Sequence, residues 1–314
     1  MISCLELLQP DVFGGLAREA LALDQQRPEP LLLLWRSESA VVLGKNQNPW
    51  KECNLQLLQE RGLPLARRIS GGGTVYHDPG NLNISWVIPR ELYVPESLYA
   101  VLRTALTSWG LTAETHPNGA TLIGGKKISG SAFCYRKTHV LHHGTLLVDA
   151  NLAQLRAVLS PPQNRLTTHA VASIPAAVQN LSALRPEISL DMLCRSVKEA
   201  AAQAFGPLIS LNAEALQPSA AALQEIRQPE WIYGQTPAFR LQLPLGGTSA
   251  SLEIRRGSIE KILCGGVPLP LSAPLPFSPA GLPPLARLLG CGDSALAGLL
   301  RQQGIVFPGT TQAG

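Results

Sequence analysis

The pattern of apolar and polar positions along the chain predicts both strands and helices. Continuous apolar runs at 31–35 and 40–43 are typical of short buried strands, and the alternation at 82–88 is typical of a half-buried strand. The clearest helix is expected at 97–110, where the last glycine suits a left-handed C-terminal cap. The same spacing predicts helices at 16–23, 151–160 and 189–205. On the first of these, Glu19 is expected to face solvent.

From residue 231 onward the pattern changes to strict alternation interrupted by glycines. Three short runs predict an antiparallel meander, at 239–243, 250–254 and 258–263. Two helices are expected after it, at 280–289 and 293–303. Asp293 is expected to be the N-cap of the second helix. Residues 207–228 carry a proline and a run of alanines, which is typical of a linker or a lone helix between domains.

Composition and charge narrow the class of protein. The 314-residue chain is 45% hydrophobic and 15% charged, which is typical of a globular protein. Its net charge of +4 suits an anionic ligand or an acidic partner, but it falls short of the basic stripe of a nucleic-acid-binding protein. No apolar run is long enough for a membrane span, and Glu6 and Asp11 stand where a signal peptide would be basic. These features predict a cytoplasmic protein that binds neither nucleic acid nor membrane.

The cysteines give little support for metal or disulfide chemistry. Six are scattered without a CxxC pair: Cys4, Cys53, Cys134, Cys194, Cys264 and Cys291. That spacing favours neither a zinc site nor a disulfide framework, so most are expected to be buried apolar residues. Cys134 is the exception to consider for chemistry, because it follows a candidate lysine, Lys127, closely.

Three consecutive glycines at 71–73 form the most distinctive stretch of the sequence. Because glycine has no Cβ, the backbone N–H groups of such a stretch can lie directly against a bound oxyanion. Arg67 and Arg68 precede the glycines and offer charged donors that suit phosphate or carboxylate. A glycine triplet alone is more often a flexible hairpin with solvent-facing arginines. The arginines and the aromatic-bearing strand at 74–76 favour an anion cradle instead.

A lysine lies in a second stretch of small residues, at 125–132. A strand–turn–strand here would point Lys127 to one face and Ile128 to the other. The small side chains at 129–131 leave room for a ligand against the lysine, whereas a lysine alone in a strand is usually solvated. The histidines at 142–143 would suggest a metal only if other ligands converged, so core or pocket-wall packing is expected.

Four stretches in order resemble the motifs of lipoate–protein ligases, at Asn48–Asn54, Arg67–Asn83, Gly125–Ala132 and His142–Leu147. Residues 231–237 resemble the opening of the accessory C-terminal domain of the larger ligases. The similarity extends over nearly the whole chain, and several motifs in order are more specific than any one. The resemblance implies an α+β fold with a mixed or antiparallel sheet of the biotin/lipoate ligase type. It implies a catalytic domain at residues 1–222 and a small α+β accessory domain at residues 223–314.

The resemblance also implies the activity and the site. The implied enzyme uses ATP to activate lipoate, or octanoate, as acyl-AMP and transfers it to a lysine of a lipoyl domain or carrier protein. Lys127 is then catalytic, bridging the acid's carbonyl oxygen and the α-phosphate. The implied adenylate-binding residues are Arg68, Gly71, Gly72, Gly73, Thr74, Val75, Tyr76, Asn118 and Lys127. The implied lipoate-binding residues are Trp35, Ser70, Gly73, His77, Gly130, His143, Gly144 and Lys127. Mg²⁺ would accompany the phosphates with few protein ligands, and no metal ligand is assigned.

Two stretches depart from the family pattern. Pro117–Ala120 stands where relatives usually have an Asn-Asp pair, which concerns an adenylate contact or a metal-linked position. Ser173–Asn180 lacks the arginines that many relatives carry in this loop, which concerns adenylate closure or acceptor choice. Both departures fit a specialised acceptor.

Three other functions are open on this sequence. The nearest is an ATP-independent octanoyl or lipoyl transferase that works through a cysteine thioester. The stretch at 114–125 contains no cysteine, and Cys134 lies between Phe133 and Tyr135, which favours a buried thiol. Biotin–protein ligase is a second alternative, but its adenylate loop alternates basic residues and glycines, unlike residues 67–73. A nucleotide-binding module without catalysis is the third.

Overall fold

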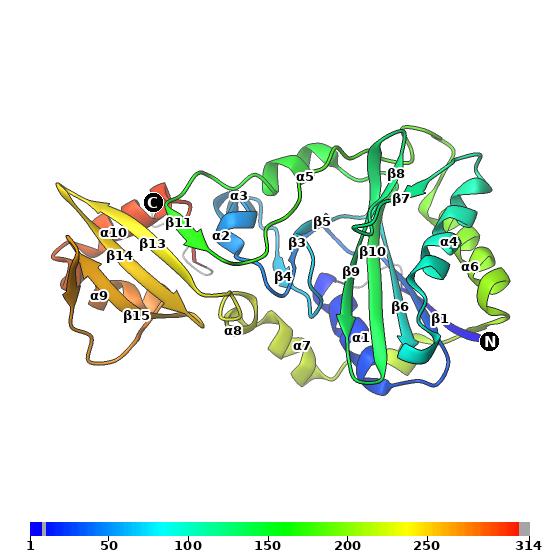
Figure 1. Ribbon diagram of the computed structural model, residues 1–314, viewed down its shortest axis with the longest axis horizontal. Coiled ribbons are helices and arrows are strands. Elements are labelled where there is room, and N and C mark those ends of the chain that lie inside the picture. The colour runs from blue at the N-terminus through cyan, green and yellow to red at the C-terminus, as the bar shows by residue number, and fades with distance from the viewer. Residues whose placement is uncertain (8–10, 308–314) are drawn as a thin grey trace.

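The computed structural model covers residues 1–314 and describes residues 1–7 and 11–307 (Figure 1). The α-helices are α1 (Val12–Gln25), α2 (Pro49–Glu52), α3 (Leu55–Glu60), α4 (Pro95–Thr107), α5 (Leu152–Val158), α6 (Leu190–Phe205), α7 (Ala220–Arg227), α8 (Pro229–Ile232), α9 (Leu282–Leu289) and α10 (Asp293–Gln302). Short 3₁₀ helices lie at Arg90–Leu92, Ala213–Leu216 and Pro279–Gly281. Within the described residues the strands form three sheets, and the largest and the C-terminal one lie at opposite ends of the long axis.

The largest sheet has the strand order β12-β1-β2-β6-β10-β9-β8-β7. Its strands are β1 (Ile2–Leu7), β2 (Leu31–Trp35), β6 (Asn81–Pro89), β7 (Glu114–Thr115), β8 (Thr121–Ile123), β9 (Lys126–Tyr135), β10 (His139–Leu147) and β12 (Leu208–Ser210). Strand β1 runs parallel to β2 and β12, and the other pairs are antiparallel. The sheet is therefore mixed, as expected.

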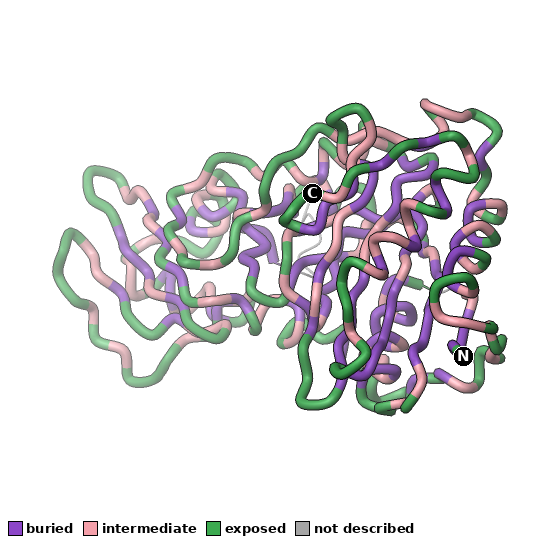
Figure 2. The backbone as a smooth tube through the Cα atoms, turned by 45° about the vertical axis from the view of Figure 1, so that its right-hand side comes forward, coloured by how far each residue is buried: buried purple, intermediate pink, exposed green. Residues whose placement is uncertain are grey.

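Strand β2 is buried on both faces, which explains its uninterrupted apolar sequence. Leu32 and Leu34 face the core under helices α4 and α6, whereas Leu31 and Leu33 face the core under α1. Because successive side chains of a strand point to opposite faces, a strand between two helical layers needs apolar residues at every position. Figure 2 shows the same distribution, with buried backbone in the sheet interiors and exposed residues mainly in loops and on outer helix faces.

A small sheet with the order β4-β3-β5 lies beside the large one. Strand β3 (Ala40–Leu43) pairs parallel with β4 (Leu65–Arg67) and antiparallel with β5 (Val75–His77). The strands predicted at 31–35 and 40–43 are thus confirmed, but they belong to different sheets. The glycine stretch at 71–73 lies in the loop that connects β4 to β5.

The C-terminal sheet contains the predicted meander, with the order β11-β13-β14-β15-β16 and with β17 paired to β15. Its strands are β11 (Leu166–Thr168), β13 (Phe239–Leu245), β14 (Thr248–Arg255), β15 (Ser258–Cys264), β16 (Val267–Leu269) and β17 (Leu275–Pro276). Strand β11 comes from the middle of the chain and was not predicted. The ring of Trp50 in α2 also packs on Phe239 and Phe277, at centroid distances of 5.4 and 5.2 Å. The two halves of the chain therefore share one core.

Most predicted helices are confirmed, but three details were wrong. Glu19 does not face solvent, because its carboxylate has buried partners and the residue is only 1% exposed. Asp293 is the first helical residue of α10, and Gly292 is its N-cap. Residues 207–228 are more than a linker, since they contain strand β12 and helix α7, which packs on α1. Among the described residues, no helix has the length and apolar composition that a bilayer span requires.

Candidate active site

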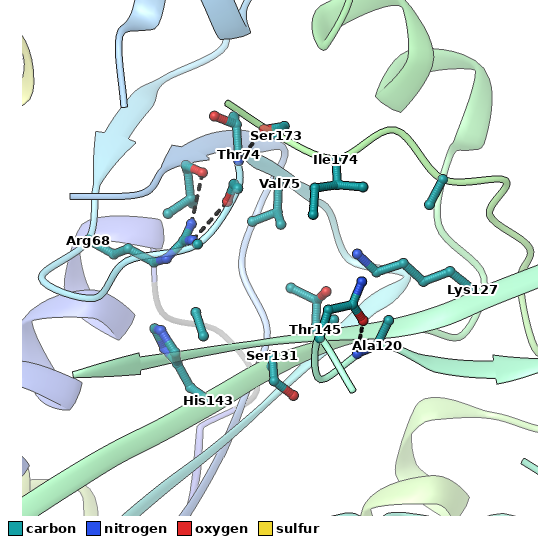
Figure 3. A pocket seen from close by; sticks show the side chains of 18 of the residues that line it. Arg68, Thr74, Val75, Ala120, Lys127, Ser131, His143, Thr145, Ser173 and Ile174 are labelled. Atoms are coloured by element: carbon teal, nitrogen blue, oxygen red, sulfur yellow. Dashed lines mark hydrogen bonds between the residues drawn. The ribbon is translucent and has the colours of Figure 1, made fainter. Parts of the chain in front are cut away.

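A cavity of about 440 Å³ lies between the glycine loop (residues 68–74) and strands β9 and β10. A segment at residues 171–177, the crossing segment, contributes a third wall. Figure 3 shows Lys127 reaching in from β9, with Arg68 and Thr74 of the glycine loop on other sides. Segments that are far apart in the sequence therefore meet around one hollow.

Lys127 places an ammonium group at this cavity. Its backbone is fixed on both sides, because Lys127 N–H donates to the Ala177 carbonyl (2.8 Å) and the Lys127 carbonyl accepts from Gln179 N–H (3.0 Å). Ile128 points to the opposite face and is fully buried, so the predicted alternation is confirmed. Burial lowers the pKa of the Lys127 ammonium. In the described part of the chain, Nζ has no hydrogen-bond acceptor, so it is available to a ligand.

Two glycines of the glycine loop line the cavity and have N–H groups that no described residue accepts. At its ends, Gly71 N–H donates to the Phe133 carbonyl (3.3 Å) and Thr74 N–H donates to a serine hydroxyl of the crossing segment (2.9 Å). Between them, the N–H groups of Gly72 and Gly73 have no acceptor among the residues that the structure describes. Gly72 has φ +81°, a conformation that side-chain-bearing residues rarely adopt. Lys127, Gly72 and Gly73 form what we call the open end of the cavity.

Arg68 shapes this loop from within. Its guanidinium donates to Ser70 Oγ (2.9 Å) and to the carbonyls of Val42 (3.2 Å), Gly71 (2.5 Å) and Gly73 (2.7 Å). Burial lowers the pKa of Arg68 to about 10, so the side chain is charged at neutral pH. Arg68 lines the cavity as predicted, but most of its donors hold the glycine loop in place.

Arg67 faces the other way and ties the site to the C-terminal part. It is fully buried, and its Nε donates to the Ile232 carbonyl at 2.7 Å. Its Nη1 donates to the carbonyls of Gly44, Lys45 and Gln47, at 2.9–3.1 Å. Arg68 therefore contacts the glycine loop and Arg67 contacts the C-terminal part of the chain, because consecutive residues near the end of a strand point to opposite sides.

The other end of the cavity, the buried end, consists of Glu19, Trp35 and His143. Glu19 Oε1 accepts from Trp35 Nε1 (3.1 Å) and Ser85 Oγ (2.5 Å), and Oε2 contacts His143 Nδ1 (2.8 Å). Burial alone would raise the pKa of Glu19, but the charge and hydrogen bond of His143, with those of Ser85 and Trp35, lower it below its ordinary value. The carboxylate is therefore ionised and fully occupied.

A hydrogen-bonded chain from Glu19 through His143 ends on Ser70, in the order of a catalytic triad. His143 Nε2 lies 2.6 Å from Ser70 Oγ, which also accepts from Arg68 Nε. A nucleophilic serine must be reachable by the acyl carbon. Ser70 is fully buried and does not line the cavity, so its hydroxyl is not exposed to an acyl carbon bound there. The hydrogen bonds among Glu19, His143 and Ser70 instead fix the wall of the cavity.

The two adjacent histidines lie on opposite faces of β10. His143 lines the cavity, whereas His142 packs on Phe133 and Tyr99 at centroid distances of 4.6 and 5.2 Å. Burial lowers the pKa of His142 and of His77, each to about 3, so both are neutral at pH 7. The expectation of core or pocket-wall packing is confirmed.

Comparison with known families identifies the protein class. The model of the lipoyl protein ligase A/B catalytic domain matches residues 15–205, which is more than half of the chain. The chain belongs to this family. The match covers the glycine loop, Lys127 and the crossing segment, and it ends at the last residue of α6.

Solved structures share the fold of this lipoyl ligase family member. P. falciparum LipL1 in complex with lipoate has 21% identity and a TM-score of 0.67, over 95% of this chain and 98% of its own. A putative lipoate protein ligase from T. acidophilum with bound lipoic acid has 23% identity and a TM-score of 0.61, over 74% and 100%. A lipoate-protein ligase A bound with ATP has 23% identity and a TM-score of 0.62, over 75% and 100%.

The lipoyl ligase fold brings most of the predicted site residues to one cavity. Those that line it are Trp35, Arg68, Gly72, Gly73, Thr74, Val75, His77, Asn118, Lys127, Gly130, His143 and Gly144. Ser70, Gly71 and Tyr76 do not line it. Tyr76 lies in the core on the other side of β5, where its hydroxyl donates to Ser39 Oγ (3.0 Å). The ligand contacts of the whole set stay predictions.

Some residues that line the cavity of this ligase family member were not identified from the sequence. Glu19 was one, although it stands three residues after Leu16 and four before Leu23, on the buried face of α1. That spacing was a usable signal, because a carboxylate on an apolar helix face needs a buried partner. Asn83 was not identified as cavity wall, and residues 173–177 of the crossing segment were connected with the site only through the family resemblance.

The two departures from the family pattern both lie at the cavity. Asn118 lines it, but Asn118 Oδ1 accepts from the N–H of Ala120 in the same turn (3.1 Å). The crossing segment brings no basic residue to the cavity at 171–177. Among the described residues no group of three or more His, Cys, Asp or Glu can hold a metal ion. Cys134 is buried at 7% exposure and does not line the cavity.

Proposed function

We propose that this protein is a lipoate–protein ligase. It uses ATP to activate lipoate, or octanoate as a weaker analogue, as acyl-AMP and transfers the acyl group to a lysine of a lipoyl domain or carrier protein. The observation that carries the proposal is the open end of the cavity, where Lys127 Nζ and the N–H groups of Gly72 and Gly73 lack partners in the described chain. Family membership and the lipoate and ATP bound by solved relatives add support.

The chemistry of activation explains why such donors are needed. A carboxylate oxygen attacks the α-phosphorus, a P–O bond forms, and the bond to the leaving pyrophosphate breaks. The two reactants are both anionic and repel one another. An ammonium between them screens that repulsion, and fixed N–H groups stabilise the charge that develops on phosphate oxygens. Lys127 takes the first role in this proposal, and Gly72 and Gly73 take the second.

The second step transfers the acyl group to the acceptor. The acceptor amine attacks the acyl carbon, a C–N bond forms, AMP leaves with the electrons of the C–O bond, and the amine releases one proton to water. The apolar residues Leu16, Val42 and Val75 would line the path of the acyl chain towards the buried end. Trp35 and His143 would then contact its far part.

Mg²⁺ does not fit the protein groups at this cavity. Glu19 is the carboxylate among the cavity-lining residues, and its oxygens are already engaged by Trp35, Ser85 and His143. Any Mg²⁺ in the reaction would therefore arrive with the nucleotide and be held by phosphates and water. The roles assigned to Lys127, Gly72 and Gly73 do not depend on it.

Mass spectrometry of a lipoyl domain tests the proposal. After incubation with the protein, ATP, Mg²⁺ and lipoate, the acceptor lysine should gain the mass of one lipoyl group, and omission of ATP should abolish the gain. A thioester transferase would instead move an octanoyl group from an acylated carrier protein without ATP. That route is not favoured, because none of the six cysteines, all in the described residues, lines the cavity.

The division into a catalytic domain at 1–222 and an accessory domain at 223–314 belongs to this proposal. Support comes from the meander strands β13 to β17, which all lie in the second part. The accessory part would also complete the wall behind the glycine loop, since Ile232 and Thr236 accept hydrogen bonds from Arg67. A cytoplasmic location fits the substrates proposed.

A further inference from the structure

The crossing segment is fastened at both ends and in its middle. At its start, Val171 N–H donates to the Asn46 carbonyl (3.0 Å), and at its end the Ala177 carbonyl accepts from Lys127 N–H (2.8 Å). In the middle, Ser173 turns towards the glycine loop, and Figure 3 shows it beside Thr74. The residue after it, Ile174, is 74% exposed. Ser173 is therefore the inward contact of a segment that is otherwise largely open to solvent.

The hydroxyl of Ser173 joins three separate elements. Its Oγ accepts from Thr74 N–H of the glycine loop (2.9 Å) and from Gln47 Nε2 (3.1 Å), and it donates to Glu52 Oε2 at the end of α2. Ser173 N–H also donates to the Glu52 carboxylate, at 3.3 Å to Oε2. A hydroxyl has one donor and two acceptor positions, so all three are in use. These four residues, Gln47, Glu52, Thr74 and Ser173, are called the clamp.

The side-chain amide of Gln47 makes four hydrogen bonds, two of them to other residues of the clamp. It is fully buried, and its Oε1 accepts from Gly44 N–H (3.0 Å) and Thr74 Oγ1 (2.8 Å). Its Nε2 donates to the Val171 carbonyl (3.3 Å) as well as to Ser173 Oγ. Both amide protons and both carbonyl lone pairs are therefore occupied. Gln47 and Glu52 do not line the cavity, whereas Thr74 and Ser173 do.

The clamp fixes one side of the two free donors. Thr74 N–H is held by Ser173, and on the other side Gly71 N–H is held by the Phe133 carbonyl. The segment also packs closely on the loop, since a Cβ added to Gly73 would lie 3.0 Å from Ser173 Oγ. The unbonded N–H groups of Gly72 and Gly73 thus stand between two anchored neighbours.

We infer that Gln47 and Glu52 are positioning residues for acyl-adenylate formation. They hold Ser173 on Thr74 and so keep the Gly72 and Gly73 N–H groups directed into the cavity. Donors that are fixed before the reaction stabilise developing charge without reorganisation, so loss of the clamp lowers kcat more than it raises KM. The inference rests on the proposed function and adds two residues that do not touch the substrate.

Kinetics of the two half-reactions test the inference. The variants are Glu52→Ala and Gln47→Ala, with Lys51→Ala on the same short helix as the matched control. We expect lipoate-dependent ATP–pyrophosphate exchange to lose about tenfold or more in kcat in the two clamp variants, with a smaller change in KM for ATP. Transfer from supplied lipoyl-AMP to a lipoyl domain should change by less than about threefold, because no pyrophosphate leaves in that step. Glu52→Gln keeps an acceptor oxygen for Ser173 and should restore most of the exchange.

Other outcomes overturn the inference. It is refuted if the clamp variants lose equally in both half-reactions, if only KM changes, or if pyrophosphate exchange is unaltered. It is also refuted if Lys51→Ala is as impaired as Glu52→Ala. Ser173→Ala is the second variant if Gln47→Ala fails to fold, because Ser173 lies on a largely exposed segment. It should lose exchange activity as the clamp variants do, whereas Ser173→Thr retains the hydroxyl and the activity.

Amide hydrogen exchange separates the clamp from the catalytic proposal. In the protein without substrates, Glu52→Ala and Gln47→Ala should raise the exchange rate of the Thr74 amide, although neither substitution removes its acceptor. An unchanged rate would refute the clamp. A wild-type protein that shows no pyrophosphate exchange with lipoate would refute the proposed function, and the Thr74 measurement would still decide whether the clamp exists.

Discussion

At the buried end of the cavity each carboxylate oxygen of Glu19 has a partner in the protein, whereas at the open end Lys127 Nζ and the N–H groups of Gly72 and Gly73 have none among the described residues. Both ends are polar and both line the same cavity. A polar group that is saturated internally shapes a wall, while an unsaturated one is available to bind. The two ends should therefore respond differently to substitution.

The largest expected effect is at the open end. Lys127→Ala should lower the kcat of lipoate-dependent pyrophosphate exchange by about 10²–10³-fold, because it removes the cation between two anions. The melting temperature should stay within about 2 °C of wild type, since Nζ has no hydrogen-bond or ion-pair partner to lose in the described part of the chain. Exchange kinetics and calorimetry on the same preparation check both statements. Near-normal exchange would remove Lys127 from the proposed mechanism.

At the buried end the effect should fall on stability. Glu19→Ala leaves His143, Trp35 and Ser85 without their acceptor and should lower the free energy of unfolding by about 3 kcal/mol. Glu19→Gln retains an acceptor oxygen and should lose less than half of that. Urea unfolding of the two variants beside Lys127→Ala measures the contrast. If Lys127→Ala proves less stable than Glu19→Ala, the proposed difference between the two ends of the cavity is wrong.

Gly130 offers a subtler change at the open end. A Cβ added there would lie 2.8 Å from Lys127 Nζ and Cε, so Gly130→Ala must displace the ammonium. We expect about a tenfold loss of exchange kcat with little loss of stability, because only a flexible side chain moves. Gly298→Ala on α10, where an added Cβ meets nothing within 4 Å, is the matched control. An unaltered kcat in Gly130→Ala would show that the position of the ammonium is not critical.

The smallest expected effect is on the pH dependence of activation. Burial lowers the pKa of Lys127, so its charged form is lost at a lower pH than for an ordinary lysine. The kcat of exchange should therefore decline on the alkaline side below pH 10.5, the ordinary value. Lys127→Arg keeps its charge and should move this decline to higher pH, even if its kcat is lower. A profile with the same alkaline limit in both proteins would contradict the prediction.

Much of the fold was readable from local patterns. The run Leu31–Trp35, the stripe of α4 and the alternating strands β13 to β15 each follow from spacing within one segment. The cavity was harder to predict from the sequence. Residues 71–73 and Lys127 could be named as candidates. Nothing local says that Gly71 N–H donates to the Phe133 carbonyl while Gly72 N–H has no acceptor among the described residues.

The sequence by itself determined the class of fold, the family and the stretches proposed to carry the chemistry, because side-chain period, glycine content and motif order are properties of short segments. Only the tertiary structure decided that Arg67 reaches Ile232 and Thr236, which side chains bind the Glu19 carboxylate, and that Gln47 and Glu52 hold the crossing segment. These outcomes depend on which donors and acceptors from distant segments satisfy one another. Such pairing is a property of the packed chain and leaves no periodic trace in the sequence.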